Sequence, residues 1–159
     1  MTYNTVIFDM DGTVLNTLED LKDSVNYALE QMGYPSRTLD EIRRFVGNGA
    51  RLLIERAVPA GTPKENCKKC LEIYSRYYAT NNKNKTKPYD GIIDLLKELK
   101  DKNYKLAIVS NKFDASVKVL CRFYYDEYIK VAIGESQNVA RKPAPDSVFT
   151  AMKELGSKV

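Results

Sequence analysis

The stretch that decides the fold is VIFDMDGT, residues 6–13. Its first three residues are apolar, and the run ends abruptly in acids, a glycine and a threonine. A short, continuous apolar run with polar residues at its end is typical of a strand buried on both faces of a parallel sheet. We therefore predict a buried strand that carries Asp9 and Asp11 at its carboxyl end, on one side if the pleat continues through Met10.

Downstream of this strand the hydrophobic spacing changes from that of a strand to that of a helix. Apolar residues recur three and four positions apart over 18–32, and Gly33 follows as a helix stop. Three further helices are predicted, over 39–46, 50–58 and 62–80. Thr38 and Glu41 form a possible capping box for the first of them. The polar segment 81–88, which ends in proline, is predicted to be the linker out of this helical module.

Beyond this linker, helices and strands alternate. The predicted elements are a helix opened by Gly91, strand 105–110, helix 114–123, strand 128–133 and helix 143–155. This alternation is typical of a parallel sheet with right-handed crossovers. The expected fold class is therefore α/β, with a doubly wound parallel sheet core of residues 1–14 and 86–159 that is interrupted by a helical insertion of residues 15–85.

Composition narrows the possible chemistry. The 159 residues contain no histidine, which excludes Ser-His-Asp triads, histidine-ligated zinc and imidazole acid–base catalysis. The formal net charge is only +4 and the basic residues are scattered, so we expect no nucleic acid partner. Cys67 and Cys70 lie in a predicted helix, where packing is more typical than zinc binding. We expect a reduced, cytoplasmic protein, because the sequence has an odd number of cysteines, three, and starts without a signal-like pattern. We expect no membrane partner, because no apolar run is long enough to span a bilayer.

Polar residues gather where the predicted strands end. Asp9 and Asp11 follow the first strand, Ser110-Asn111-Lys112 follow the second, and Arg141-Lys142 precede the last helix. Ligands of such sheets bind at the carboxyl ends of the strands. Taken singly, these residues are more typical of turn acids, helix caps and surface lysines. Together, donors and a cation beside a helix N-terminus favour a phosphate site.

Three stretches resemble the first three motifs of the haloacid dehalogenase superfamily of phosphatases. They are FDMDGTV at 8–14, VSNK at 109–112 and KPAPD at 142–146. The helical insertion resembles the all-helical cap of that family, and the phosphoglycolate phosphatase branch is the nearest match. The resemblance extends to Gly47-Asn48-Gly49 in the insertion and to Pro88-Tyr89-Asp90-Gly91 at the return to the core.

The resemblance implies magnesium-dependent hydrolysis of a small phosphorylated metabolite, such as phosphoglycolate. Asp9 would be the nucleophile that forms an aspartyl-phosphate, and Asp11 the general acid and base. Ser110 would hold a phosphoryl oxygen, and Lys142 would neutralise charge. Asp9 and the backbone carbonyl of Asp11 would bind Mg²⁺. Further substrate-binding residues are expected at Gly12, Thr13 and Asn111 and, in the cap, at Gly49 and Arg51.

The family's fourth motif, an acidic cluster after a further strand, is not found before the last residue, Val159. The resemblance then implies an underligated magnesium ion and an exposed edge on the first strand. A sequence shorter than the natural protein, a natural truncation or complementation by a second chain would each explain this. Two alternative functions stay open: a phosphosugar mutase of the same superfamily, and a catalytically inactive phosphate-binding protein. The oligomeric state is open too.

Overall fold

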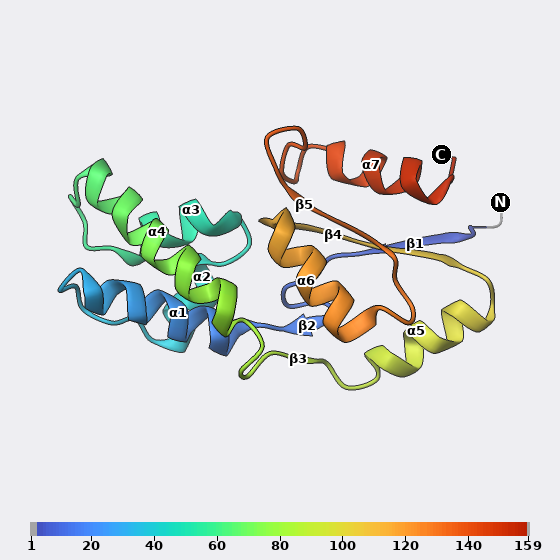
Figure 1. Cartoon of the computed structure of the whole chain (residues 1–159), viewed down its shortest axis with the longest axis horizontal. Coiled ribbons are helices and arrows are strands. Elements are labelled where there is room, and N and C mark those ends of the chain that lie inside the picture. The colour runs from blue at the N-terminus through green and yellow to red at the C-terminus, as the bar shows by residue number, and fades with distance from the viewer. Residues whose placement is uncertain (1–2, 159) are drawn as a thin grey trace. The chain divides into compact units, whose positions relative to one another are not determined.

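The computed structural model describes residues 3–158 and divides into two compact units. Residues up to Asn16 and from Lys87 onward form an α/β unit, and Thr17–Thr86 form a helical unit (Figure 1). The sequence places the insertion at 15–85. The chain therefore leaves the α/β unit shortly after its first strand and returns to it after four helices.

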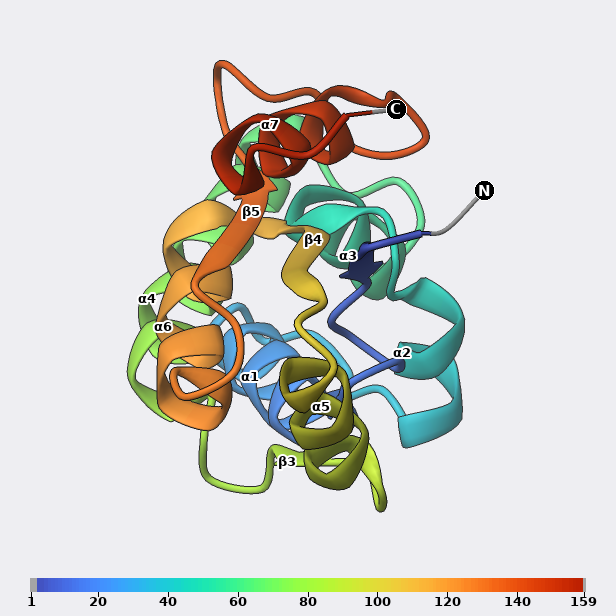
Figure 2. The same cartoon turned by 90° about the vertical axis from the view of Figure 1, so that its right-hand side faces the viewer.

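Three parallel strands form the sheet of the α/β unit. They are β1 (Thr5–Phe8), β4 (Lys105–Phe113) and β5 (Val131–Glu135). Figure 2 shows β4 between β1 and β5, the order that the hydrogen bonds give. Val6 is in register with Leu106, and Ile108 with Ala132. The parallel pairing confirms the predicted α/β class.

Helices cover both faces of this sheet (Figure 1). The helices are α5 (Ile92–Asp101), α6 (Asp114–Tyr125) and α7 (Asp146–Leu155). Leu106 and Ile108 share a core with residues of α5 and α6, whereas Ala107 and Val109 pack with Ala151 of α7. Successive residues of a strand point to opposite faces, so a continuous apolar run supplies both cores.

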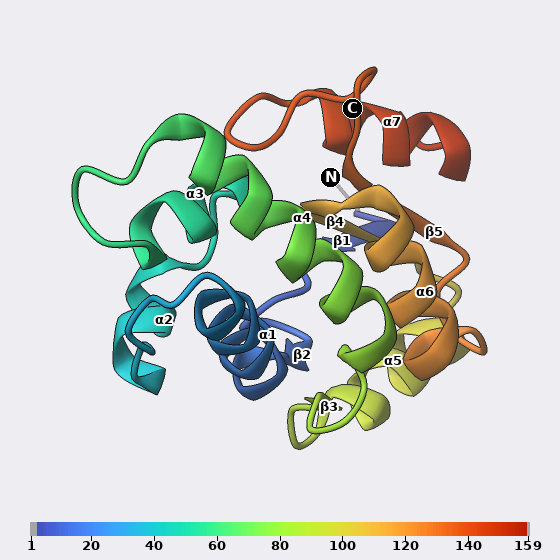
Figure 3. The ribbon, with the colours of Figure 1, turned by 60° about the vertical axis from the view of Figure 1, so that its left-hand side comes forward.

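The helical unit has a core of its own. It contains α1 (Leu18–Gln31), α2 (Leu39–Phe45), α3 (Gly49–Ala57) and α4 (Lys64–Asn81). Figure 3 shows α1 and α4 side by side, and the capping box of Thr38 and Glu41 is present at α2, as predicted. Cys70 is fully buried, and this burial raises the pKa of its thiol to about 11. Cys70 therefore serves the packing of the unit.

The two connections between the units pair with each other. β2 (Leu15–Asn16) and β3 (Lys87–Pro88) form a two-stranded antiparallel ladder, where the sequence predicts only a polar linker. Just inside the helical unit, the buried carboxylate of Asp20 accepts hydrogen bonds from the backbone N–H groups of Lys85 and Thr86, at 3.0 and 2.8 Å. The exit of the chain from this unit is thereby fixed to α1.

Several boundaries differ from the prediction: β5 spans Val131–Glu135 rather than 128–133, and two further differences concern the site residues. β4 continues to Phe113 rather than ending at residue 110, because Phe113 still pairs with Glu135 of β5 after a register shift beyond Val109. α7 begins at Asp146 rather than at residue 143, since the segment 142–145 forms a turn ahead of it. The polar residues expected just beyond the strand are therefore part of β4 itself.

Gly134 in β5 provides a test of this packing. A Cβ atom at Gly134 would lie 2.4 Å from Cα of Asp114 and 2.6 Å from the carbonyl oxygen of Lys112. Both are backbone atoms, so a methyl group fits only if β5 or the start of α6 moves. We expect Gly134→Ala to lower the free energy of unfolding by about 3 kcal/mol, measured in urea. An unchanged free energy of unfolding would contradict the close approach of β5 to α6.

Candidate active site

The predicted site residues of the α/β unit lie where its strands end. Asp9 follows β1 directly, Ser110 and Asn111 belong to the last part of β4, and Lys142 lies in the turn that leads to α7. The carboxyl ends of β1 and β4 meet at the same edge because the two strands are parallel neighbours. This edge is the usual ligand position of α/β sheets.

Asp9 and Lys142 form an ion pair that joins the first and third motifs. The Lys142 Nζ atom lies 2.5 Å from Asp9 Oδ1 and also donates to the carbonyl oxygen of Val109, at 3.3 Å. The side chain of Asp9 is 41% exposed and that of Lys142 is 30% exposed. A carboxylate and its cation are therefore both accessible to a ligand.

Asn111 fixes the backbone of Lys142. Its Nδ2 donates to the Lys142 carbonyl oxygen at 3.1 Å, and the Lys142 N–H donates to Asn111 Oδ1 at 2.6 Å. Asn111 is buried, whereas Lys142 is half-buried, so this two-point contact is partly shielded from water. The amide that the sequence assigns to substrate binding thus holds Lys142 in place, and its contact with a substrate stays a prediction.

A tight turn follows β1 and contains Asp11. β1 ends at Phe8, so the pleat does not continue through Met10. The buried Met10 instead accepts backbone hydrogen bonds from Thr13, Val14 and Leu15 through its carbonyl oxygen. Gly12 has a φ of 78°, which favours glycine. Gly12 and Thr13 are exposed, and the position of Asp11 is set by this turn rather than by a strand.

Asp11 pairs with Lys112, which belongs to the VSNK motif but is not among the predicted site residues. Lys112 Nζ lies 3.0 Å from Asp11 Oδ1. The backbone N–H of Lys112 donates to the hydroxyl oxygen of the buried Ser110, at 3.1 Å. Two features of the sequence indicated it beforehand: its place in VSNK, two residues after Ser110, and its place in the polar cluster at the end of the second predicted strand. The site therefore contains two acid–lysine pairs, one for each aspartate.

The described residues hold no preformed cluster of metal-binding side chains. Within residues 3–158, no group of three or more Cys, Asp or Glu side chains is arranged to hold a metal ion. Asp9 nevertheless offers carboxylate oxygens at an accessible position. Mg²⁺ prefers oxygen ligands and commonly takes one or two carboxylates, with phosphate oxygens and waters in the other positions. The donor chemistry at Asp9 therefore fits this ion.

The remaining predicted residues lie in the helical unit. Gly49 is the first residue of α3, and Arg51 is an exposed cation that pairs with Glu55 at 3.5 Å. Their part in substrate binding stays a prediction.

Among residues 3–158, every helix is too short or too polar to span a membrane.

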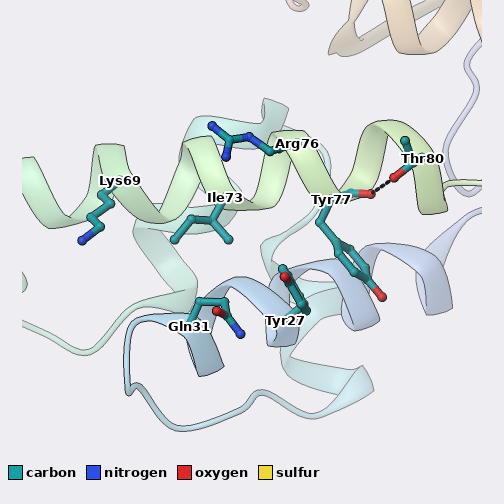
Figure 4. Close-up of a pocket in the computed structure, with 7 residues that line it drawn as sticks. All are labelled: Tyr27, Gln31, Lys69, Ile73, Arg76, Tyr77 and Thr80. Atoms are coloured by element: carbon teal, nitrogen blue, oxygen red, sulfur yellow. Dashed lines mark hydrogen bonds between the residues drawn. The ribbon is translucent and has the colours of Figure 1, made fainter.

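A hollow of about 500 Å³ lies between α1 and α4 (Figure 4). Its lining residues are Tyr27, Gln31, Lys69, Ile73, Arg76, Tyr77 and Thr80. The rings of Tyr27 and Tyr77 stack at the surface of the helical unit, with their centroids 4.0 Å apart. Tyr74 and Tyr78, by contrast, are buried in the core. None of the predicted site residues lines this hollow.

The sequence matches a known family and several named proteins. The family model described as haloacid dehalogenase-like hydrolase matches residues 6–159. The chain is 29% identical over 154 residues to a phosphoglycolate phosphatase of Aquifex aeolicus, covering 96% of the chain and 70% of that protein. It is 31% identical over 157 residues to phosphoglycolate phosphatase 1 of Pseudomonas aeruginosa, covering 95% of the chain and 57% of that protein. The chain thus spans about 57–70% of the length of these curated relatives.

Solved structures show the same architecture. A presumed phosphoglycolate phosphatase from Lactobacillus delbrueckii subsp. bulgaricus superimposes with a TM-score of 0.91 at 34% identity, covering 99% of this chain and 75% of that one. A predicted phosphoglycolate phosphatase from Haemophilus somnus gives a TM-score of 0.89 at 28% identity, with 99% and 74% covered. The likeness therefore includes both the α/β unit and the helical unit.

Proposed function

The chain belongs to the haloacid dehalogenase-like hydrolases, and from this premise we propose that it hydrolyses a small phosphomonoester of the phosphoglycolate type. The observation that carries the proposal is the accessible pair of Asp9 and Lys142, with Nζ 2.5 Å from Oδ1. A carboxylate nucleophile needs a cation beside it when it attacks a dianionic phosphoryl group. The phosphoglycolate phosphatases among the relatives favour that substrate class.

In the first half of the proposed reaction, Asp9 attacks the phosphorus atom. A bond forms between a carboxylate oxygen of Asp9 and phosphorus, and the bond from phosphorus to the ester oxygen breaks. Asp11 donates a proton to the departing oxygen, which leaves as an alcohol. Lys142 neutralises negative charge on the nucleophile and on the phosphoryl oxygens. The product of this half is an aspartyl-phosphate at Asp9.

In the second half, water replaces Asp9 on phosphorus. Asp11, now a carboxylate, takes a proton from the attacking water, and the bond between Asp9 and phosphorus breaks to release inorganic phosphate. Ser110 accepts the N–H of Lys112 through its Oγ atom, which leaves its hydroxyl proton for a phosphoryl oxygen. Asp9 and Asp11 thereby return to their starting states.

A magnesium ion suits this chemistry and would be held by the Asp9 carboxylate and the Asp11 backbone carbonyl. Such an ion supplies positive charge to the phosphoryl oxygens when it is bound. The residues of the chain meanwhile orient the substrate. In the helical unit, the start of α3 at Gly49 and the cation of Arg51 are proposed to receive the carboxylate of a phosphoglycolate-like substrate.

The decisive test is phosphate release from 2-phosphoglycolate by the 159-residue chain. We expect release in the presence of Mg²⁺ and its loss after the metal is removed with a chelator, with recovery when Mg²⁺ is restored. A sugar phosphate that is isomerised without phosphate release would instead indicate a mutase. Binding of phosphate by the folded chain with no turnover of any phosphomonoester would contradict the proposal and indicate a binding protein.

A further inference from the structure

We propose that Lys112 is a positioning residue for Asp11, so that the site carries a second cation dedicated to its general acid and base. This inference rests on the proposed function and extends it by one residue. Lys112 does not contact the reacting atoms in this account; it acts through the carboxylate of Asp11. Lys142 then serves the nucleophile Asp9, and Lys112 serves the general acid and base Asp11.

Burial distinguishes the pair of Lys112 and Asp11 from the others. Its two side chains are 8% and 15% exposed, respectively. In twelve other ion pairs of the described residues, each side chain is at least 22% exposed, the lowest value being that of Arg37. Exposed pairs contribute little to stability. The pair of Lys112 and Asp11 is more shielded from water than these twelve pairs.

An ion pair that is largely withdrawn from water adds little net stability. Taking two charges out of water costs free energy that their attraction often does not exceed, and apolar residues of similar size can serve equally well. Removal of one partner, by contrast, leaves an uncompensated buried charge. A lysine placed against Asp11 at the end of β4 is therefore better explained by what it does to Asp11 than by what it adds to the fold.

The backbone around Lys112 is closely defined. β4 continues through Lys112 to Phe113, and the Lys112 N–H donates to Ser110 Oγ. The Lys112 carbonyl oxygen packs closely against Gly134 of β5: a Cβ atom added at Gly134 would lie only 2.6 Å from it. Because Asn111 holds the backbone of Lys142 while Lys112 holds Asp11, two adjacent residues of β4 position the two halves of the site.

Contact with Lys112 would affect how well Asp11 transfers protons. A general acid works only when it is within hydrogen-bond reach of the oxygen that it protonates, so the orientation of its carboxylate affects the rate. After Asp11 has given its proton to the leaving oxygen, it is a carboxylate beside the phosphoryl group on Asp9, and the two repel each other. Lys112 lowers this repulsion while keeping Asp11 in one position.

The test compares Lys112→Met in two backgrounds. In the otherwise unchanged chain, we expect Lys112→Met to lower kcat for 2-phosphoglycolate by about 10- to 100-fold, with KM changed less than about threefold, because the acid is misplaced rather than the substrate lost. In an Asp11→Asn background, assayed with p-nitrophenyl phosphate, whose leaving group needs no proton, Lys112→Met should have little further effect on kcat. Lys102→Met, which removes an exposed lysine paired with Glu98 on α5, is the matched control and should leave kcat unchanged.

Three results would overturn the proposal: an unchanged kcat in Lys112→Met, a change confined to KM, or an equal further loss in the Asp11→Asn background. A readout without turnover separates this inference from the proposed function. In a double-mutant cycle on the free energy of unfolding, Lys112→Met and Asp11→Asn should be strongly non-additive. Additive effects would overturn the pairing even in an active enzyme, whereas coupling in a chain that releases no phosphate would leave the pair intact and reject only the phosphatase.

Discussion

Asp9→Asn is expected to abolish phosphate release from 2-phosphoglycolate while the chain keeps its fold. The amide of asparagine is nearly the same size as the carboxylate, but it is not a nucleophile toward phosphorus. Its oxygen can still accept the hydrogen bond from Lys142 Nζ that Asp9 accepts at 2.5 Å. Loss of a nucleophile from a covalent mechanism should lower kcat by about 10⁴-fold or more. The measurement is phosphate release with 2-phosphoglycolate as the only substrate, together with the thermal unfolding midpoint, which reports whether the fold is kept.

Asp101→Asn is the matched control for this change, because Asp101 is an exposed acid at the end of α5. It should release phosphate at the rate of the unchanged chain. An Asp9→Asn chain that keeps more than a few per cent of the activity would remove Asp9 from the mechanism. An inactive Asp101→Asn chain would show that loss of activity does not report on the site.

Lys142→Ala is expected to lower kcat by about 10²- to 10³-fold and to raise KM as well. Its Nζ contacts Asp9 Oδ1 and the carbonyl oxygen of Val109, so truncation removes the cation from the nucleophile and from the position of the phosphoryl group. A fixed charge aimed at a phosphoryl group contributes about this factor in enzymes. The measurement is the pair of kcat and KM values for 2-phosphoglycolate.

Lys153→Ala provides the comparison, because Lys153 is an exposed lysine of α7. This variant should be indistinguishable from the unchanged chain. If Lys142→Ala were equally silent, Lys142 would be an ordinary surface lysine and the pair with Asp9 would have no part in turnover.

The features of the fold that depend on local sequence patterns could be predicted. The apolar run at 6–8 is a strand of a parallel sheet because its residues supply both faces, and the period of three and four over 18–32 gives α1. The capping box at Thr38 is also present, since it depends only on residues three positions apart. Local spacing therefore sufficed for the fold class and for most helices.

Other features depend on contacts between distant residues. β2 and β3 are two residues long, too short to have a period, and they exist because the two connections lie next to each other. β4 extends through Asn111 and Lys112 although these residues are polar, and their side chains contact the distant residues Lys142 and Asp11.

The candidate site shows the same division. The strand-end motifs predict Asp9 and Lys142 at one site, and the structure brings them together. Which lysine pairs with Asp11 could not be predicted, because the turn at Met10 ends the strand pleat and redirects the chain. Asn111 is polar and close to a phosphate motif, which indicates a ligand contact, yet its amide bonds to the Lys142 backbone 31 residues away.

The most direct test of the account is to trap the phosphoryl group on Asp9. Asp11→Asn should still be phosphorylated by p-nitrophenyl phosphate, because that leaving group needs no proton, but it should hydrolyse the intermediate slowly because no base activates water. Peptide mass spectrometry after an acid quench should find one phosphoryl group on the peptide that contains Asp9, and none in the Asp9→Asn, Asp11→Asn chain. A phosphoryl group on any other residue, or phosphate release by Asp11→Asn without a phosphorylated peptide, would contradict Asp9 as the nucleophile.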